Sequence, residues 1–294
     1  MINIIAEIGV NHNGDIGLAK EMIASAAECG ANYAKFQSWT EDRLRKGVWD
    51  EDSQPFFNFK NKRDFFKKVQ ITNEDHEKLI EECNKHKIKF LTTCFDRSRL
   101  KFLSSLGLEL IKVASPDAAS FGLIKDLSEN FSKVIVSTGM TSNQEIVNLA
   151  EKLHKTNIDF VLMHCVSMYP TPINKISLLK MKFIKKLTKQ RIDQGTMQPV
   201  PAYRGEFGIS DHSLGFNVPI AAIARGATWI EKHFTIDKNL PGPDNQMSST
   251  PSDFKTIRSF ADDFITMKNN KNESVQPEEI ELKKLIKDRF GDNN

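Results

Sequence analysis

The side chains best suited to chemistry are two histidines at the ends of two consecutive strand-like runs. His212 lies in FGISDHSLG, residues 207–215, and His233 lies in WIEKHFT, residues 229–235. A tight Gly-Pro turn, PGPDN, follows the second run and carries Asp244. Neutral imidazole nitrogens at equivalent heights on neighbouring strands can bind one divalent metal ion together. The pattern therefore predicts a metal pair, His212 and His233, with Asp244 beside it.

Two imidazoles with a carboxylate or water suit Mn²⁺, Fe²⁺ or Zn²⁺ better than a purely oxygen-ligated Mg²⁺ or Ca²⁺. The competing interpretation is that each histidine is a hydrogen-bonded structural residue of its strand. Two histidines at equivalent positions favour the metal pair. His12 and His164, in contrast, are predicted to be structural or to support the ligands.

Polar side chains also mark the ends of the other strand-like runs. Lys35 and Lys112 are embedded in apolar runs, where they suit an anion that combines phosphate and carboxylate. Lysine supplies a point charge, and hydroxyl groups donate to phosphate oxygens. The alternative is that both lysines face solvent. The polar residues at these ends include Glu7, Lys35, Gln37, Thr93, Lys112, Ser115, Asp117, Ser137, Ser167, Tyr169, Ser210 and Glu231.

The elements that must position these residues are short β-branched runs that alternate with longer helical patterns. The runs cover residues 3–10, 33–38, 89–94, 110–115, 133–139, 159–165, 207–212 and 229–235. Eight such βα units predict an α/β protein that closes into a (β/α)8 TIM barrel, whose active site lies at the carboxyl ends of the strands. A doubly wound open sheet competes, but no Gly-rich dinucleotide fingerprint follows the first run.

We expect one catalytic barrel domain over residues 1–268 and a charged C-terminal helix and tail over residues 269–294. Two stretches interrupt the alternation and are interpreted as insertions. Residues 39–70 are polar and aromatic, and too long for an ordinary connection, which indicates a functional or mobile segment. Residues 189–206 are polar and contain Pro and Gly, and we expect them close to the barrel mouth.

Composition limits the partners and the compartment. Lys and Arg number 41 against 38 for Asp and Glu, a balance that argues against a nucleic-acid binder. The four cysteines show no CxxC pairing, which indicates a reducing compartment. The start, MINIIAEIGV, lacks the basic region of a signal peptide, and no apolar run approaches the roughly 18 residues of a membrane span. We therefore expect a cytoplasmic protein without a membrane partner.

Seven motifs occur in the order found in the sialic acid synthases, which include legionaminic and pseudaminic acid synthases: AEIGVNHNG, KFQS, VSTGM, HCVSMYPTP, GISDHSLG, EKHFT and GPD. The chain resembles the catalytic barrel of that family from residue 4 to about residue 264. The resemblance implies that phosphoenolpyruvate condenses with the open-chain aldehyde of an N-acylated mannosamine-type sugar. The products would be a nonulosonic acid and phosphate, released by C–O cleavage. A divalent ion, Mn²⁺ with Mg²⁺ or Co²⁺ as alternatives, would polarise the aldehyde.

The resemblance also implies roles for individual residues. His212 and His233 would hold the metal, Glu7 would position or deprotonate the attacking water, and Asp244 would assist near the metal and sugar. The matching substrate-binding positions are Lys35, Thr93, Lys112, Ser115, Asp117, Ser137, Ser167, Tyr169 and Ser210.

The chain departs from the family pattern in three places. Asp117 stands where many members have Glu, and Asn245 stands where many have His. The chain also stops where members usually continue into an antifreeze-like domain, which caps the barrel of the dimer partner and supplies an arginine. The resemblance implies a homodimer, although the missing domain removes one contact between its subunits. The absence of that domain implies a separate cap protein, a different acceptor or a weakened activity. Residues 189–206 are the candidate for replacing part of the cap.

Two other classes of function stay open. One is a different enzyme: a synthase of a shorter 3-deoxy-ulosonic acid, or a pyruvate aldolase that uses Lys112 as a Schiff-base lysine. The other is a non-catalytic sugar-phosphate-binding barrel with a regulatory or scaffolding role. The near-complete set of reactive side chains favours a synthase.

Overall fold

Eight parallel strands close into a barrel in a computed structural model that describes residues 1–40, 56, 59–156, 158–189, 191–192, 199–200 and 205–286. The strands are β1 (Asn3–Glu7), β2 (Tyr33–Ser38), β3 (Lys89–Cys94), β4 (Leu110–Val113), β5 (Lys133–Ser137), β6 (Asp159–Cys165), β9 (Gly205–Asp211) and β10 (Trp229–His233). The first strand pairs with both β2 and β10, which closes the ring. The predicted (β/α)8 barrel is confirmed, and the open sheet is excluded.

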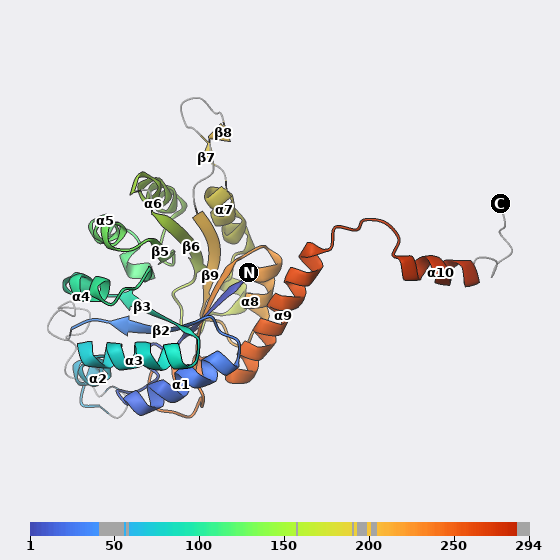
Figure 1. The fold of residues 1–294 in the computed structure, drawn as a ribbon. Helices are drawn as coiled ribbons and strands as arrows, with labels where there is room; N and C mark the ends of the chain where they lie inside the picture. The colour runs from blue at the N-terminus through green and yellow to red at the C-terminus, as the bar shows by residue number, and fades with distance from the viewer. Residues whose placement is uncertain are drawn as a thin grey trace.

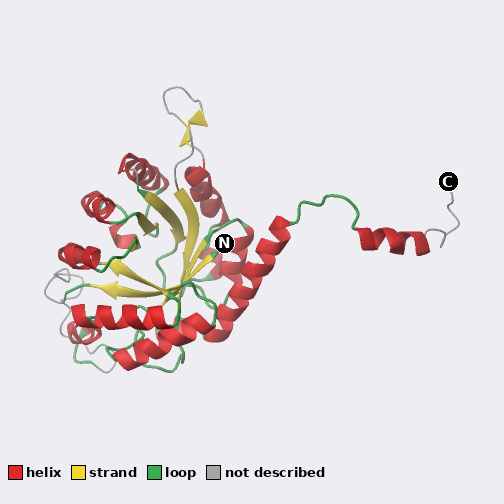
Figure 2. Cartoon of the chain, in the orientation of Figure 1, coloured by secondary structure: helices red, strands yellow, loops and turns green. Residues whose placement is uncertain are grey.

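Helices surround the barrel (Figure 1, Figure 2). Side-chain caps start several of them: Asp15 caps α1, Thr72 caps α3, and Thr250 caps α9 through a capping box with Asp253. Among the described helices, none is both long and apolar enough to cross a membrane. The helices are α1 (Ile16–Glu28), α2 (Lys62–Val69), α3 (Asn73–Lys85), α4 (Leu100–Ser105), α5 (Phe121–Asn130), α6 (Asn143–Thr156), α7 (Leu178–Lys189), α8 (Asn217–Ala224), α9 (Pro251–Asn269) and α10 (Pro277–Ile286).

The alternation of side chains along each strand builds two apolar layers. Outward-facing residues such as Ile4 and Ile230 pack beneath the helices, in the larger cluster. Inward-facing residues fill the amino-terminal half of the barrel, as side-chain layers do in this fold. This inner plug is made of Ile5, Tyr33, Leu91, Leu110, Ile135, Val161, Met163 and Trp229. The plug leaves the carboxyl half of the barrel for polar side chains.

The described parts of the stretch at residues 189–206, which are residues 189, 191–192, 199–200 and 205–206, lie at the end of the barrel opposite the mouth. They include two short antiparallel strands, β7 (Arg191–Ile192) and β8 (Pro199–Val200), which extend outward in Figure 1. The stretch connects α7 to the start of β9, where Gly205 pairs with Phe160 near the start of β6. A connection from a helix to the next strand reaches the amino end of that strand. The expectation that this stretch lies near the mouth was therefore wrong.

The stretch at residues 39–70 follows β2 and so begins at the carboxyl end of the barrel. Residues 41–55, 57 and 58 lie outside the described residues, whereas Trp39 and α2 are described. Trp39 packs with Val10, Phe65 and Val69 in a small apolar cluster, against which Phe66 also packs. The aromatic residues that the structure describes in this stretch therefore pack against one another, and they bring α2 to the mouth.

Candidate active site

A cavity of about 360 Å³ opens at the carboxyl ends of the strands. All the predicted site residues line it except Ser167 and Asp244, which lie close behind its wall. The lining residues are Glu7, Lys35, Gln37, Trp39, Phe66, Thr93, Phe95, Asp96, Lys112, Ala114, Ser115, Pro116, Asp117, Ser137, Cys165, Tyr169, Ser210, His212, Glu231 and His233. Residues from every barrel strand or the loop after it therefore meet in one cavity.

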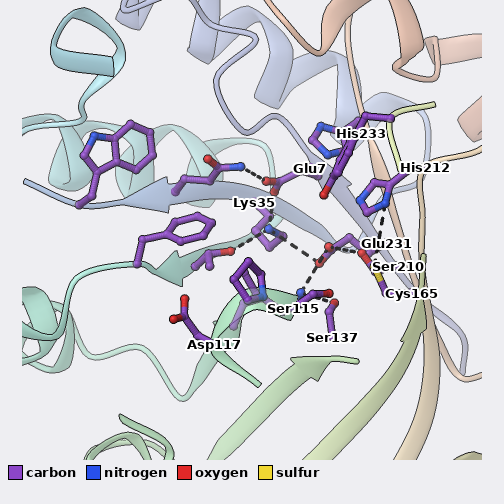
Figure 3. Close-up of a pocket in the computed structure, with 18 of the residues that line it drawn as sticks. Glu7, Lys35, Ser115, Asp117, Ser137, Cys165, Ser210, His212, Glu231 and His233 are labelled. Carbon is purple, nitrogen blue, oxygen red and sulfur yellow. Dashed lines mark hydrogen bonds and ion pairs between the residues drawn. The ribbon is translucent and has the colours of Figure 1, made fainter. Parts of the chain in front are cut away.

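Lys35 occupies the centre of a buried charge network on the cavity floor (Figure 3). Its Nζ lies 2.5 Å from Glu7 Oε2 and 3.8 Å from Glu231 Oε2. It also donates a hydrogen bond of 2.9 Å to Thr93 Oγ1. Glu7 accepts a further hydrogen bond of 2.7 Å from Gln37. Strand register explains the central pair, because Glu7 and Lys35 lie opposite each other on β1 and β2.

Lys112 makes a second set of contacts on the same floor. Its Nζ donates to Ser137 Oγ at 2.7 Å and lies 3.5 Å from Glu231 Oε1. The same Glu231 oxygen accepts from Ser210 Oγ at 2.8 Å, and these two residues are register partners on β10 and β9. Glu231 therefore lies between the two lysines and joins the two sets of contacts.

Burial and charge set the protonation of this network. Burial alone would raise the pKa of Glu231, but the charges of Lys112 and Lys35 lower it to about 2. Burial lowers the pKa of Lys35, but Glu231 and Glu7 outweigh that effect and raise it. Burial lowers the pKa of Lys112, which Glu231 only partly offsets, and burial raises the pKa of Glu7. Glu231 is thus a fixed negative charge, whereas Glu7 is shifted towards the range in which a carboxyl exchanges protons.

Gly139 lets hydroxyl groups from two loops converge beside the lysines. Its N–H donates to Ser115 Oγ at 3.0 Å. A Cβ at this position would overlap Ser167 Oγ and would lie 2.7 Å from Ser115 Oγ. The hydroxyl of Ser167 is buried and has no hydrogen-bond partner within the described structure. A larger residue here would therefore force both hydroxyls to move, whereas the glycine leaves them as donors that suit the oxygens of an anion.

The two predicted metal-binding histidines face each other across 5.5 Å between ring centroids. His212 Nδ1 lies 3.0 Å from the carbonyl oxygen of Val166. A carbonyl only accepts, so Nδ1 carries the proton and Nε2 is free to bind a metal. His233 Nδ1 lies 3.6 Å from Asp244 Oδ2 and has no hydrogen-bond partner within the described residues. Burial lowers the pKa of His233 to about 4, which keeps the ring neutral.

These features fit a metal that takes nitrogen ligands and completes its shell with water or substrate oxygens. One ring is held by a backbone carbonyl, the other has an unpaired nitrogen, and both line the cavity. Within the described ranges, no group of three or more His, Cys, Asp or Glu side chains is arranged to hold a metal ion. The two imidazoles would therefore supply only part of the coordination of such an ion, and water or substrate would have to supply the rest.

Several lining residues were given no role by the sequence. Glu231 precedes His233 by two residues, so strand alternation alone places both on the inner face. Cys165 ends β6 on that same inner face, and its Sγ lies 3.9 Å from His212 Nδ1. Phe66 gives no comparable signal, because it reaches the cavity only through the packing of α2.

Comparisons with known proteins identify the family and the fold. A family model described as the NeuB family matches residues 22–273. The chain is 34% identical over 262 residues to a Campylobacter jejuni protein named N,N'-diacetyllegionaminic acid synthase, covering 86% of this chain and 73% of the relative. A protein of the same name from Legionella pneumophila is 32% identical over 294 residues, covering 97% of this chain and 78% of that relative. The crystal structure of the sialic acid synthetase from Leptospira borgpetersenii, in complex with citrate, has a TM-score of 0.80 at 29% identity and covers 97% of this chain and 91% of that one.

Proposed function

The chain belongs to the NeuB family, and from that premise we propose that it condenses phosphoenolpyruvate with an N-acylated mannosamine-type aldose to give a nonulosonic acid and phosphate. Its relatives include legionaminic acid synthases. The observation that carries the proposal is the pairing of two buried lysines and their hydroxyl partners with two imidazoles in one cavity. The lysines suit the anionic substrate, and the imidazoles suit the carbonyl substrate.

Phosphoenolpyruvate carries a carboxylate and a phosphate, and the cavity floor offers donors for both. Lys35 with Thr93 forms one cationic group, and Lys112 with Ser137 forms another. The hydroxyls of Ser115 and Ser167 converge beside them. Donors that are fixed before the reaction stabilise developing charge without reorganising, which is the largest catalytic term in many enzymes.

In the proposed reaction, C3 of phosphoenolpyruvate forms a bond to the aldehyde carbon, and the aldehyde oxygen takes up a proton to become a hydroxyl. A water molecule adds its oxygen to C2 and gives up two protons, one to the new hydroxyl and one to the leaving phosphate. The bond between C2 and the bridging phosphate oxygen then breaks, phosphate leaves, and C2 becomes the ketone. Glu7 would accept a proton from the water, because its carboxylate lines the cavity floor beside Lys35. Lys112 and the neighbouring serines would stabilise the departing phosphate.

We further propose that His212 and His233 hold a divalent ion, most simply Mn²⁺. Such an ion would act as a Lewis acid towards the aldehyde oxygen and would help orient the sugar. Asp244 would hold His233, whose Nδ1 is 3.6 Å away. Tyr169 packs against His212 at 4.2 Å between ring centroids and would restrict how that ring tilts.

The direct test is phosphate release from phosphoenolpyruvate by purified protein with a panel of N-acylated hexosamines, with and without Mn²⁺. Release that requires both a sugar and the metal is the expected result. Release without sugar would indicate a simple phosphatase. Bound phosphoenolpyruvate without release in any mixture would favour the non-catalytic barrel.

A pyruvate aldolase is the second candidate, because burial lowers the pKa of Lys112 and so favours the neutral amine that a Schiff base needs. Borohydride reduction in the presence of pyruvate distinguishes the two enzymes. A covalent adduct on Lys112 would support the aldolase. The synthase predicts an unmodified Lys112, because its Nζ is engaged with Ser137 and Glu231.

A further inference from the structure

Two buried asparagines join the end of β10 to the turn that carries Asp244. Asn11 lies in the loop after β1 and is 1% exposed, whereas Asn245 belongs to the turn itself and is 0% exposed. Each asparagine makes hydrogen bonds to two segments: residues 234–235, which directly follow β10, and residues 241–248. We call this pair of side chains the asparagine clamp, because an amide that bonds to two segments fixes their separation.

Asn11 bridges the two segments through its NH2 group. Its Nδ2 donates to the carbonyl oxygen of Phe234 at 2.8 Å and to Ser248 Oγ at 2.9 Å. Ser248 Oγ in turn donates to the carbonyl oxygen of Asp244 at 2.6 Å. A carbonyl only accepts, so the nitrogen of the amide must face Phe234. Asn11 therefore ties the residue after His233 to the backbone of Asp244.

Asn245 makes a second bridge from inside the turn. Its Nδ2 donates to the carbonyl oxygen of Pro241 at 2.8 Å, and its Oδ1 accepts from Thr235 Oγ1 at 2.6 Å. Gly242 lets the turn lie close to the loop after β1, because a Cβ at this glycine would lie 3.1 Å from Asn13 Oδ1. Buried side chains on both of its sides therefore hold this turn in place.

The clamped turn places a carboxylate beside one of the two imidazoles. Asp244 Oδ2 lies 3.6 Å from His233 Nδ1, which is buried and has no hydrogen-bond partner within the described ranges. His233 lines the cavity, so Nε2 is its nitrogen towards the cavity. A carboxylate behind a metal-binding imidazole fixes the ring and raises its basicity. Because 3.6 Å is slightly longer than a hydrogen bond, a small shift of the turn would close this contact or break it.

We propose that Asn11 and Asn245 position Asp244, which in turn holds the neighbouring imidazole ready for a divalent ion. The clamp thereby sets the affinity of His212 and His233 for that ion. This inference rests on the proposed function, because it assumes that the two imidazoles bind a metal. A clamp that served only the fold would stabilise the loops and leave the ion unaffected. The two roles differ in one measurable respect: a positioning residue loses its effect on the ion once Asp244 is removed.

The test measures the dissociation constant of Mn²⁺ from the electron paramagnetic resonance signal of the free ion, without any substrate. Asp244→Ala should weaken binding by about tenfold to 100-fold, the usual cost of losing a group behind a metal ligand. Asn245→Ala and Asn11→Ala should each weaken it by about tenfold, because the turn loses two hydrogen bonds in either variant. In the Asp244→Ala background, either asparagine substitution should weaken binding by less than about twofold, because the carboxylate that the clamp positions is gone.

Ser248→Ala tests the same link with a smaller change, should an asparagine variant fail to fold. It removes the side-chain link from Asn11 to Asp244 but keeps the backbone N–H of Ser248, which donates to the same carbonyl at 3.0 Å. We expect binding of Mn²⁺ to weaken about threefold. Asn32→Ala is the matched control, because Asn32 Oδ1 accepts from the N–H of Ile4 at 2.9 Å at the opposite end of the barrel. This control should lower the free energy of unfolding in urea and leave the Mn²⁺ dissociation constant unchanged.

The outcomes separate this inference from the proposed function. Asparagine variants that lower the free energy of unfolding but leave Mn²⁺ binding unchanged would overturn the inference. Equal losses of affinity with and without Asp244 would also overturn it, since the clamp would not act through the carboxylate. Equal Mn²⁺ binding by the parent protein and His233→Ala would show that the metal assignment is wrong, and the inference would fall with it. The expected affinities without any phosphate release from phosphoenolpyruvate would support the inference and overturn the proposed reaction.

Discussion

Two buried clusters of lysine and carboxylate groups lie back to back at β9 and β10, although the lysines of the inner cluster, Lys35 and Lys112, come from β2 and β4. Register pairs Ser210 with Glu231 and, one residue on, Asp211 with Lys232. Because side chains alternate along a strand, the first pair faces into the barrel and the second faces the surrounding helices. The two clusters contain the same types of groups, and all four residues are buried.

The clusters differ in whether their polar atoms are satisfied. Lys232 Nζ lies 2.7 Å from Asp211 Oδ2, and both oxygens of Asp211 also accept hydrogen bonds from Ser213, each at 2.9 Å. In contrast, Glu231 Oε2 is buried and has no hydrogen-bond partner among the described residues. An unsatisfied buried polar atom costs about 1–3 kcal/mol. The polar atoms of the outer cluster are thus satisfied within the described structure, whereas the inner cluster keeps a buried carboxylate oxygen that could accept a hydrogen bond from a ligand.

The largest effect should come from breaking the outer pair. Lys232→Met leaves the carboxylate of Asp211 buried beneath helices without its cation. Removing one partner of a buried ion pair costs about 3–5 kcal/mol, and we expect the free energy of unfolding to fall by that amount. Urea denaturation followed by circular dichroism measures it. A loss below about 1 kcal/mol would show that the outer pair contributes little to stability.

A substitution in the inner cluster should lower turnover more than it lowers the free energy of unfolding. Glu231→Gln removes the charge that lies between Lys35 and Lys112. We expect turnover to fall about 100-fold, equivalent to about 2.7 kcal/mol, because a positioned charge in a site is worth this much. The free energy of unfolding should change by less than about 1.5 kcal/mol, since the cavity admits water to both lysines. Parallel kinetics and denaturation check both, and a stability loss equal to that of Lys232→Met would erase the contrast.

His164 lies on the outer face of the barrel, but its polar atoms, unlike those of the outer cluster, are not satisfied. It is buried at 2% exposure, and neither ring nitrogen has a hydrogen-bond partner within the described structure. Burial, assisted by the charge of Lys180, lowers its pKa to about 4. The ring is therefore neutral near pH 7, and a neutral ring tolerates missing partners better than a charge does.

This assignment predicts a pH dependence of stability. The unfolded chain binds a proton at His164 near pH 6.5, whereas the folded chain resists it down to about pH 4. Stability is therefore present above pH 6.5 and is lost as the pH falls towards 4, by about 2 kcal/mol between pH 7 and pH 5. Denaturation curves of the parent protein and of His164→Leu at both pH values measure the difference. Parallel losses in the two proteins would remove His164 as the source.

The closed barrel and the residues that face its mouth could be predicted from the sequence. Eight β-branched runs were enough to predict the closed barrel, because parallel strands with intervening helices have few other arrangements. The period of two places Glu231 on the same face as His233, and the carboxyl-end rule places both in the mouth. The metal ligands and catalytic roles stay predictions, because a residue's type and location do not establish what it does.

Other features depend on contacts that no local pattern encodes. Phe66 reaches the mouth because α2, through Phe65 and Val69, packs on Trp39 and Val10, which belong to other parts of the chain. The buried Gly139 is needed only because hydroxyls from two other loops approach it. The misplacement of residues 189–206 had a different cause. The rule that helix-to-strand connections lie at the amino end of a barrel already excluded the mouth.

The smallest and sharpest comparison uses two serines, one from each cluster. Ser213 donates to Asp211 at 2.9 Å, so Ser213→Ala should lower the free energy of unfolding by about 1 kcal/mol and leave kinetics unchanged. Ser137 accepts a hydrogen bond from Lys112 at 2.7 Å in the cavity. Ser137→Ala should leave the free energy of unfolding nearly unchanged and should raise the KM for phosphoenolpyruvate about fivefold. A fivefold change in binding corresponds to about 1 kcal/mol, the energy expected for Ser213→Ala in stability. The exposed Ser105→Ala on α4 is the control for both measurements. If Ser137→Ala instead costs as much stability as Ser213→Ala and leaves KM unchanged, the inner cluster is a structural element as well, because its hydroxyl would then be serving the fold and not the ligand.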